Sequence, residues 1–396
     1  MKILYISKYA SYNPYGMDTR HIYLSRELVK KGNDVTLYLS DSNHQLKKLP
    51  IDYSQNIDGI NVRWIKTTKY QKAYGIRRIL SWFNFEVKLR KELKKHTNVD
   101  LVIISSLSLL SIFNGIYIKK KHKSKLVFEI RDIWPLVLRR ISSITRINPF
   151  YQFLSFAEKK GYKEADLIVG TMPNLESHVS STINQKKKVI WIPHLINPNL
   201  NYLETHSHRE ELKAFRMNFK FVVCYAGSIN RSSSIELLLK SAVSESMESI
   251  GFAILGDGPL LDELRLKYSS KNIQFFDKIP QEEVVSFLNE CDILYDGYLK
   301  SDIYKFGNSR NKYVEYCLAA KPVLIGYSGF PLFFDEEQCG IIVEPESVEA
   351  IIKGIQLLVN KDQMDLDKMG ENAHRFATNY LNVSVQTEKL LDAIAV

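Results

Sequence analysis

The chain has 396 residues, 45% of them hydrophobic and 25% charged, which is typical of a soluble globular protein with about two domains. This composition excludes a disordered or fibrous protein, and no segment approaches the ~18 uncharged apolar residues of a membrane span. The apolar run over residues 3–6 is too short for a signal peptide, so we expect a cytoplasmic protein. The four cysteines are widely spaced, which favours buried thiols over a disulfide framework or a zinc site.

Charge divides unevenly between the two halves of the chain. Residues 1–200 contain 34 basic and 15 acidic residues, a net charge of +19, whereas residues 201–396 contain 20 basic and 29 acidic residues, a net charge of −9. This asymmetry predicts that the first half faces a polyanion, which is either nucleic acid or an anionic membrane.

The first half alternates between predicted strands and helices. A strand over 2–7 is followed by a loop, a helix over 19–31 with Asp18 or Thr19 as N-cap and Gly32 as its stop, and a strand over 34–40. This order is a βαβ unit. We further predict strands over 62–67, 101–106, 126–131, 167–171 and 189–193, and helices over 76–95 and 149–163.

A polar stretch over 194–218 indicates an interdomain linker, and a second alternating series follows it. Its predicted strands cover 219–226, 252–255, 273–276, 293–295, 322–326 and 340–343. Its predicted helices cover 235–242, 260–268, 282–289, 311–319 and 347–359, and stretches over 361–378 and 385–395 end the chain. Two such series predict two doubly wound α/β domains, with ligands at the carboxyl ends of the strands.

Residues 306–323, FGNSRNKYVEYCLAAKPV, carry the strongest chemical signal. Gly307, Asn308 and Ser309 form a predicted loop at a helix start, where free N–H groups favour an anion. Lys312 and Glu315 share one face of that helix. A nucleoside diphosphate suits this pattern, because the lysine neutralises phosphate and the carboxylate accepts from ribose hydroxyls. The alternative is a surface Lys/Glu pair with a solvated cap.

Eight strings in order along the chain resemble the family-4 retaining glycosyltransferases of the GT-B fold, of the type that builds bacterial capsule and O-antigen polysaccharides. They are PYGMDTRHIYLSRELVKKGNDVTL, FEIRDIWP, ADLIVGTMP, VIWIPH, VVCYAGSI, ILGDGP, ECDILY and the 306–323 segment. The resemblance implies two Rossmann-like doubly wound domains facing across a cleft. The expected boundaries are an acceptor-binding domain over 1–197, a nucleotide-sugar-binding domain over 198–375, and a C-terminal helix over 376–396 that packs back toward the first domain.

The resemblance also implies residues for a UDP-linked or other nucleotide-sugar donor. Glu315 matches the second glutamate of the family's Glu-x7-Glu motif, and Gly307 stands at the first. Ser228 and Ser233 stand where the family often has arginine and lysine, so we expect Arg231, and also Arg310, to help Lys312 hold the diphosphate. The GDG string at 256–258 is also read as an ordinary strand-to-helix turn. The expected donor-binding set is Gly16, Gly227, Ser228, Gly256, Asp257, Gly258, Lys278, Gly307, Asn308, Ser309, Lys312 and Glu315.

Acceptor binding is expected in the first domain, at Tyr15, Arg131 and Asp132. Asp132 directly follows a predicted strand end, although Arg131 and Asp132 also fit a structural ion pair. The expected catalytic residues are Asp132, Lys312 and Arg231. Because the leaving phosphate itself can take the acceptor's proton, we expect no metal and no cofactor, and the Asp-Leu-Asp string at 365–367 is read as solvated surface.

Residues 77–96 combine seven basic residues with an apolar stripe, which is typical of an amphipathic helix on an anionic membrane. Five lysines between 119 and 125 add to the charge. The alternative is that the apolar stripe packs into the domain core. With the resemblance, this feature implies a polyprenyl-diphosphate-linked saccharide acceptor and attachment to the inner face of the plasma membrane.

Three other functions fit parts of the sequence. A nucleic-acid-binding protein would explain the basic half, but no known recognition motif is present, and we expect no nucleic-acid partner. A nucleotide-sugar epimerase or hydrolase would use the same architecture. A non-catalytic scaffold at the membrane surface would explain the residues that differ from the family pattern.

Overall fold

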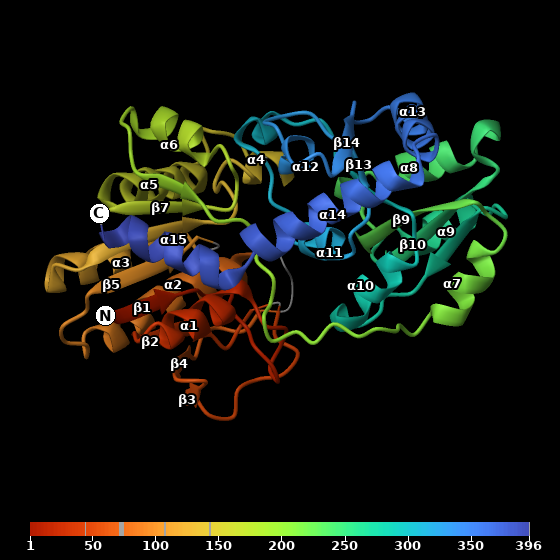
Figure 1. The fold of residues 1–396 in the computed structure, drawn as a ribbon. Helices are drawn as coiled ribbons and strands as arrows, with labels where there is room; N and C mark the ends of the chain where they lie inside the picture. Colours follow the sequence, from red (N-terminus) through yellow and green to blue (C-terminus); the bar gives the residue numbers. More distant parts are fainter. Residues whose placement is uncertain (44, 71–74, 107, 142–143, 396) are drawn as a thin grey trace. The chain divides into compact units, whose positions relative to one another are not determined.

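The computed structural model describes residues 1–43, 45–70, 75–106, 108–141 and 144–395 (Figure 1). The chain divides into two compact units. Unit 1 contains Met1–Asn197 and the C-terminal residues from Val383, and unit 2 contains Pro198–Asn382. Each unit is a parallel β-sheet flanked by helices, as the two alternating series predicted.

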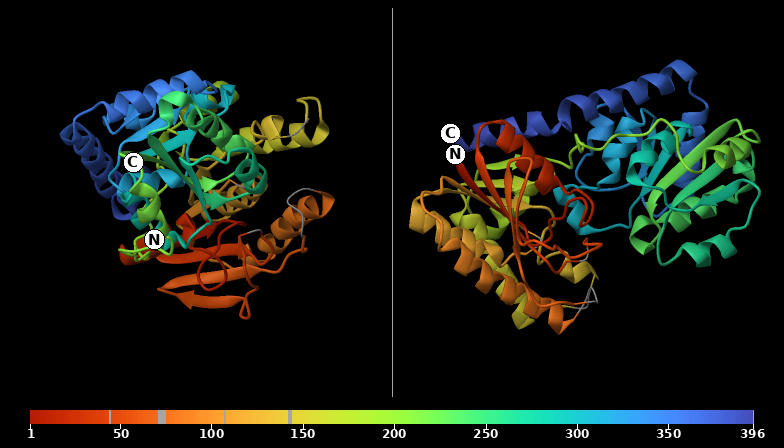
Figure 2. Two further views of the ribbon diagram at one scale, coloured as in Figure 1. Left: turned by 90° about the vertical axis from the view of Figure 1, so that its right-hand side faces the viewer. Right: turned by 90° about the horizontal axis from the view of Figure 1, so that it is seen from below.

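Unit 1 is built on an eight-stranded sheet with the order β3-β4-β2-β1-β5-β6-β7-β8. All neighbours pair in parallel except β3 and β4, which form an antiparallel hairpin at one edge (Figures 1 and 2). The hairpin was not predicted, because the short polar strand SQNI lacks an apolar run. The strands are β1 (Lys2–Ile6), β2 (Asp34–Ser40), β3 (Ser54–Ile57), β4 (Ile60–Ile65), β5 (Leu101–Ser105), β6 (Lys125–Ile130), β7 (Leu167–Gly170) and β8 (Val189–Trp191).

The first helix of unit 1 begins and ends at the residues that the sequence predicts. Thr19 is the N-cap of the first helix, and Gly32 follows its end with a φ of 81°, a conformation that suits glycine. The helices are α1 (Arg20–Lys30), α2 (Ile76–Leu93), α3 (Ser111–His122), α4 (Leu138–Ile141), α5 (Pro149–Glu164), α6 (Leu175–Ile183) and α15 (Val383–Ala395).

The last helix belongs to the core of unit 1. Val383, Leu390 and Ile394 on α15 are buried in the same apolar cluster as the central strands, and α15 packs against α1. The expected C-terminal segment 376–396 begins too early, because helix α14 of unit 2 continues without interruption to Tyr380.

Unit 2 has a six-stranded, wholly parallel sheet with the order β11-β10-β9-β12-β13-β14. The chain runs outward from β9 in one direction and then returns to β12, so the switch point of the topology lies between these two strands. The strands are β9 (Phe221–Ser228), β10 (Ile250–Asp257), β11 (Ile273–Phe276), β12 (Ile293–Gly297), β13 (Val323–Gly326) and β14 (Gly340–Val343).

Unit 2 contains a helix, α7, where the sequence analysis predicted only a polar linker, and this helix packs against β10. The rest lie close to the predicted ranges. They are α7 (Arg209–Arg216), α8 (Ile235–Ala242), α9 (Leu261–Lys267), α10 (Gln281–Asn289), α11 (Lys312–Leu318), α12 (Phe333–Glu336), α13 (Val348–Val359) and α14 (Gln363–Tyr380). The four cysteines, all in unit 2, are buried free thiols, as predicted.

The basic helix α2 has two apolar faces. Trp82, Phe85 and Leu89 are buried in unit 1, whereas Phe83 and Val87 are exposed. Core packing, the alternative in the sequence analysis, therefore describes one side of the helix, and membrane binding through the other side stays a prediction. Within the described ranges, none of the helices combines the length and the hydrophobicity needed to cross a bilayer.

Candidate active site

A pocket of about 460 Å³ opens in unit 2 at the carboxyl ends of the central strands. The strand ends that line it are those of β9 and β10, and doubly wound sheets bind their ligands at this carboxyl edge. The pocket combines backbone from two strand ends with side chains from α11. Its lining residues are Ala226, Gly227, Ser228, Leu255, Gly256, Asp257, Lys278, Ile279, Val284, Lys312, Glu315 and Tyr316.

Three glycines let the backbones at these strand ends approach one another. A Cβ atom on Gly256 would lie 1.9 Å from the Gly227 carbonyl oxygen, and one on Gly258 would lie 2.3 Å from the Ile229 carbonyl oxygen. Gly227 and Gly256 also have φ values of 144° and 149°, which side chains rarely tolerate. The close approach of the backbones explains why the GDG string has glycines at this strand-to-helix turn. Gly227 and Gly256 also line the pocket.

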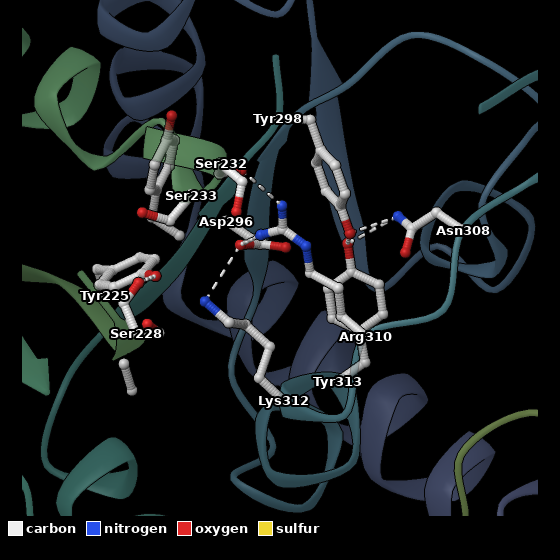
Figure 3. Close-up of polar contacts among 12 residues, drawn as sticks. Tyr225, Ser228, Ser232, Ser233, Asp296, Tyr298, Asn308, Arg310, Lys312 and Tyr313 are labelled. Carbon is white, nitrogen blue, oxygen red and sulfur yellow. Dashed lines mark hydrogen bonds and ion pairs between the residues drawn. The ribbon is translucent and has the colours of Figure 1, made fainter. Parts of the chain in front are cut away.

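Lys312 places its ammonium group directly over the Gly227 backbone. A methyl group on Gly227 would lie 2.9 Å from Lys312 Nζ, and Nζ lies 3.9 Å from the centre of the Tyr225 ring. The ammonium also donates a hydrogen bond of 3.2 Å to Oδ1 of Asp296, at the end of β12 (Figure 3). Asp296 was not predicted, although an aspartate at a strand's carboxyl end is a recognisable signal.

Arg310 binds the same carboxylate as Lys312. Its Nη1 donates to Oδ1 of Asp296, and its Nη2 donates to the carbonyl oxygen of Ser232 at 3.1 Å. The guanidinium carbon lies 3.6 Å from the centre of the Tyr298 ring (Figure 3). Arg310 therefore ties the loop after β9 to the end of β12, and it does not line the pocket.

Glu315 lies buried at the pocket wall, one helical turn after Lys312. Gln281, on α10, donates a hydrogen bond of 2.7 Å to its Oε1. Burial raises the pKa of Glu315, and the hydrogen bond from Gln281 opposes that rise. The carboxylate lines the pocket, where it can accept from donors such as ribose hydroxyls. Gln281 was not predicted, because no local pattern links it to a helix 34 residues further along the chain.

The loop before α11 differs from the predicted anion-binding helix start. The helix begins at Lys312, so Gly307, Asn308 and Ser309 precede its first turn and do not line the pocket. The reason is that Asn308 donates to the hydroxyl groups of Tyr298 and Tyr313, which are themselves 2.5 Å apart (Figure 3). This buried polar contact holds the loop away from a helical conformation.

Two other predicted cationic groups lie at the surface of unit 2. Arg231 is exposed in a short 3-10 helix over Arg231–Ser233 and does not line the pocket. Lys278 lines the pocket and pairs with Asp257 at 3.0 Å, and this hydrogen bond lowers the pKa of Asp257. Among the described residues, no group of three or more side chains is arranged to hold a metal ion.

The predicted acceptor residues Arg131 and Asp132 follow β6 in unit 1. Nε and Nη1 of Arg131 are buried without a hydrogen-bond partner among the described residues, and no described ion pair joins Arg131 to Asp132. The Asp132 side chain is exposed, yet the surrounding protein removes enough water to raise its pKa, while Arg131 acts in the opposite direction. The alternative, a structural ion pair, is therefore not formed between these two described residues.

The two other predicted residues of unit 1 have clear packing roles. Tyr15 lies in the apolar core, where its ring packs edge-on against Trp64 and its hydroxyl accepts from Gln55 at 2.9 Å. A Cβ on Gly16 would lie 2.5 Å from the Gln45 carbonyl oxygen, so the chain passes too closely there for a side chain.

A buried ionic network, which was not predicted, lies beside Arg131. Glu129 pairs with Arg20 at 3.0 Å and accepts from the Tyr5 hydroxyl at 2.9 Å. Burial alone would raise the pKa of Glu129, but the nearby cations lower it to about 2. Arg131 contributes to this lowering through its charge, although its Nε and Nη1 make no hydrogen bond to Glu129 or to any other described residue. Burial lowers the pKa of His21 to about 3, so that ring is neutral at pH 7.

Both units match families of glycosyltransferases. Residues 15–200 match the family described as Glycosyltransferase Family 4, and residues 220–361 match the family described as Glycosyl transferases group 1. A probable glycosyltransferase, WbjE of Pseudomonas aeruginosa, is 21% identical over 222 residues, which are 55% of this chain and 55% of that relative. The match therefore spans about half of the length of WbjE.

Solved structures of similar fold cover the whole chain. Sucrose-phosphate synthase of Thermosynechococcus elongatus is 16% identical with a TM-score of 0.72, over 100% of this chain and 99% of that one. Anabaena Alr3699/HepE, solved in complex with UDP, is 14% identical with a TM-score of 0.67, over 100% of both chains. The α,α-trehalose-phosphate synthase of Burkholderia vietnamiensis is 10% identical with a TM-score of 0.72, over 100% of both chains.

These similarities and the two parallel-sheet units define the class of protein. The chain is a glycosyltransferase with the GT-B fold. Its donor, acceptor and cellular location are proposed below.

Proposed function

We propose that the chain transfers a sugar from a UDP-linked donor to a saccharide carried on polyprenyl diphosphate, with retention of anomeric configuration. The observation that carries the donor proposal is the single pocket that holds Lys312 above Gly227 and Glu315 one helical turn away. The ammonium is placed to neutralise a diphosphate, and the carboxylate to accept from ribose. The UDP complex of the similar Anabaena protein supports uracil as the base of the donor.

In this proposal, the bond between the donor's anomeric carbon and its phosphate oxygen breaks while the acceptor oxygen bonds to the same face of that carbon. The departing phosphate oxygen takes the acceptor's proton, so that charge and atoms balance. Lys312 stabilises the negative charge that develops on the leaving diphosphate. Because the protein supplies this cation, we propose that transfer continues without an added metal or cofactor and in the presence of EDTA.

We propose that Arg131 and Asp132 bind the acceptor. Two nitrogen atoms of the buried Arg131 guanidinium have no hydrogen-bond partner among the described residues, so this side chain favours an anionic group on the acceptor. The diphosphate of a polyprenyl-linked saccharide is such a group. The exposed Asp132 carboxyl offers an acceptor for sugar hydroxyl groups.

An exposed aromatic stripe on unit 1 supports attachment to an anionic membrane. Phe83 stacks on Phe153, and Phe113 stacks on both Phe153 and Phe156. These side chains join α2, α3 and α5, and part of the stripe lines a groove of about 400 Å³ whose rim includes Lys91 and Lys94. Aromatic rings beside lysines suit the interface of an anionic leaflet, which contributes about 1 kcal/mol for each nearby basic residue.

Flotation with lipid vesicles tests the membrane proposal. The wild-type protein should float with vesicles that contain phosphatidylglycerol at low salt, and less with pure phosphatidylcholine or at high salt. Phe83→Ser with Phe153→Ser should abolish flotation, whereas Leu266→Ser, which removes an exposed leucine on α9 of unit 2, should not. Flotation that the double variant retains would contradict attachment through this stripe.

A transfer assay tests the enzymatic proposal. UDP release should require both a UDP-sugar and a polyprenyl-diphosphate saccharide, and the product should contain the transferred sugar. UDP release without an acceptor would indicate a hydrolase, and conversion of one UDP-sugar into another would indicate an epimerase. Nucleotide binding without turnover, across a panel of acceptors, would indicate a non-catalytic scaffold.

A further inference from the structure

A single buried carboxylate, that of Asp296, holds two cationic side chains beside the donor pocket. Its Oδ1 accepts from Lys312 at 3.2 Å and from Arg310, yet Asp296 itself does not line the pocket (Figure 3). We infer that Asp296 is a positioning residue for the donor's diphosphate, and that it acts by holding the Lys312 ammonium over the Gly227 backbone. This inference rests on the proposed function of the pocket.

The Lys312 ammonium keeps binding capacity for a ligand. An ammonium has three N–H donors, and among the described residues only Asp296 accepts a hydrogen bond from Lys312. The Lys312 side chain is 17% exposed, so it is fixed by its surroundings but still open to the pocket. Two N–H groups therefore remain for phosphate oxygens above Gly227.

Arg310 is the more rigidly held of the two cationic side chains that bind Asp296. It donates to the Ser232 carbonyl oxygen at 3.1 Å and lies 3.6 Å from the centre of the Tyr298 ring. Both contacts leave it little freedom to move. The Asp296 carboxylate binds to Arg310 and thereby becomes a fixed acceptor for the more flexible Lys312.

One oxygen atom of Asp296 is the hydrogen-bond acceptor that holds Lys312, which also lies over the ring of Tyr225. The other oxygen, Oδ2, is buried and has no hydrogen-bond partner among the described residues. Lys312 and Arg310 are like charges that meet at Oδ1, so they would repel each other if the carboxylate were neutralised. An amide at position 296 would therefore release Lys312 from its place over Gly227, and diphosphate binding would weaken although a negative charge is removed.

A double-mutant cycle on UDP binding separates positioning from a general structural role. By calorimetry, Asp296→Asn and Lys312→Met should each raise the Kd for UDP at least tenfold. In the Lys312→Met background, Asp296→Asn should change that Kd less than twofold, because the group on which it acts is gone. Independent effects of the two substitutions, or tighter UDP binding by Asp296→Asn, would overturn the inference.

Uridine, which lacks the phosphates of UDP, is the control ligand for this experiment. Asp296→Asn should bind uridine within twofold of the wild type, because the nucleoside does not reach the ammonium. An equal loss of uridine and UDP binding would overturn the inference in favour of a structural role. If the wild-type protein binds none of UDP, GDP, dTDP and CMP, the proposed donor pocket is wrong. If it binds UDP but the effects of the two substitutions are additive, only the role of Asp296 is refuted.

Reductive methylation of the wild type gives a test that needs no variant to fold. With formaldehyde and cyanoborohydride, Lys312 should react at least tenfold more slowly than the exposed Lys353, and UDP should slow it further. Peptide mass spectrometry measures both rates in one sample. Equal rates for Lys312 and Lys353 without UDP would show that the carboxylate does not hold the ammonium and would overturn the inference.

Discussion

Gln281 donates a hydrogen bond of 2.7 Å to Glu315, and this contact joins α10 to the helix that carries the candidate ribose-binding carboxylate. It fixes one oxygen of a carboxylate that lines the pocket. It also opposes the effect of burial, which raises the pKa of Glu315. If Glu315 binds the donor as proposed, this pair predicts that donor binding depends on pH.

Uridine binding should weaken in acid. In the proposed complex, ribose hydroxyls donate to ionised Glu315, so affinity should be full above its raised pKa and should be lost as the pH falls through that value. Uridine is the ligand to use, because it has no phosphate that titrates in this range. The measurement is the Kd of uridine by NMR titration between pH 7 and pH 4.

Two variants test this assignment. Gln281→Met removes the hydrogen bond that favours the ionised form, so the loss of uridine affinity should begin at a higher pH. Glu315→Gln should bind uridine more weakly at pH 7 and should lose the pH dependence. An unchanged pH profile in Glu315→Gln would assign the titration to another group.

Lys312→Met should remove most transfer while the fold is retained. The methionine keeps the length of the side chain but cannot neutralise the leaving diphosphate, a type of loss that commonly costs about 100-fold or more in kcat. Lys353→Met, which removes an exposed lysine on α13 of the same unit, is the matched control and should keep wild-type kcat. Near-wild-type turnover in Lys312→Met would refute the role of this ammonium.

Gly256→Ala should destabilise unit 2. The added methyl group would lie 1.9 Å from the Gly227 carbonyl oxygen, and the φ of 149° disfavours any side chain. We expect a loss of about 2–5 kcal/mol in the free energy of unfolding of this unit, measured by chemical denaturation. Gly326→Ala is the control, because its methyl group would meet its nearest neighbour at an ordinary 3.6 Å. Equal stability of the two variants would contradict the close approach of the strand ends.

Glu86, half-buried on α2, should make unit 1 less stable as the pH rises from about 4.5 to 7. Burial raises the pKa of Glu86 to about 7, against hydrogen bonds from Ser111 and Asn114. A raised folded-state pKa means that the folded unit favours the protonated form, so stability is lost as the pH rises through this window. The expected loss is up to ~3 kcal/mol relative to Glu86→Gln.

Chemical denaturation of unit 1 at pH 5 and pH 7 measures this effect. The difference in unfolding free energy between wild type and Glu86→Gln should shift in favour of the variant at pH 7. Glu92→Gln, at a partly exposed position on the same helix, is the matched control. A pH-independent difference would show that Glu86 does not titrate in this range.

The strands of both sheets could be predicted because short stretches of the sequence indicate them. Short apolar runs bounded by turns marked nearly every strand, and Thr19 and Gly32 marked both ends of α1. The hairpin strand β3 was not recognised, because antiparallel pairing at a sheet edge tolerates a polar sequence.

The candidate site was only partly predictable. Lys312 and Glu315 were found because their spacing within one helix is itself a local pattern. Asp296 joins them through the adjacency of β9 and β12, and Gln281 through the packing of α10 on α11. Such contacts depend on the order of strands in the sheet and on helix packing, which no short motif encodes.

Thermal unfolding with nucleotides tests the central claim, that the pocket of unit 2 binds a nucleoside diphosphate. UDP, GDP, dTDP and CMP are compared without added metal, with ATP as control. UDP at about 100 times its Kd should stabilise the native state by roughly 2.7 kcal/mol and raise Tm measurably, and Lys312→Met and Glu315→Gln should lose that shift. No shift with any of the four, or the same shift in both variants, would contradict the claim.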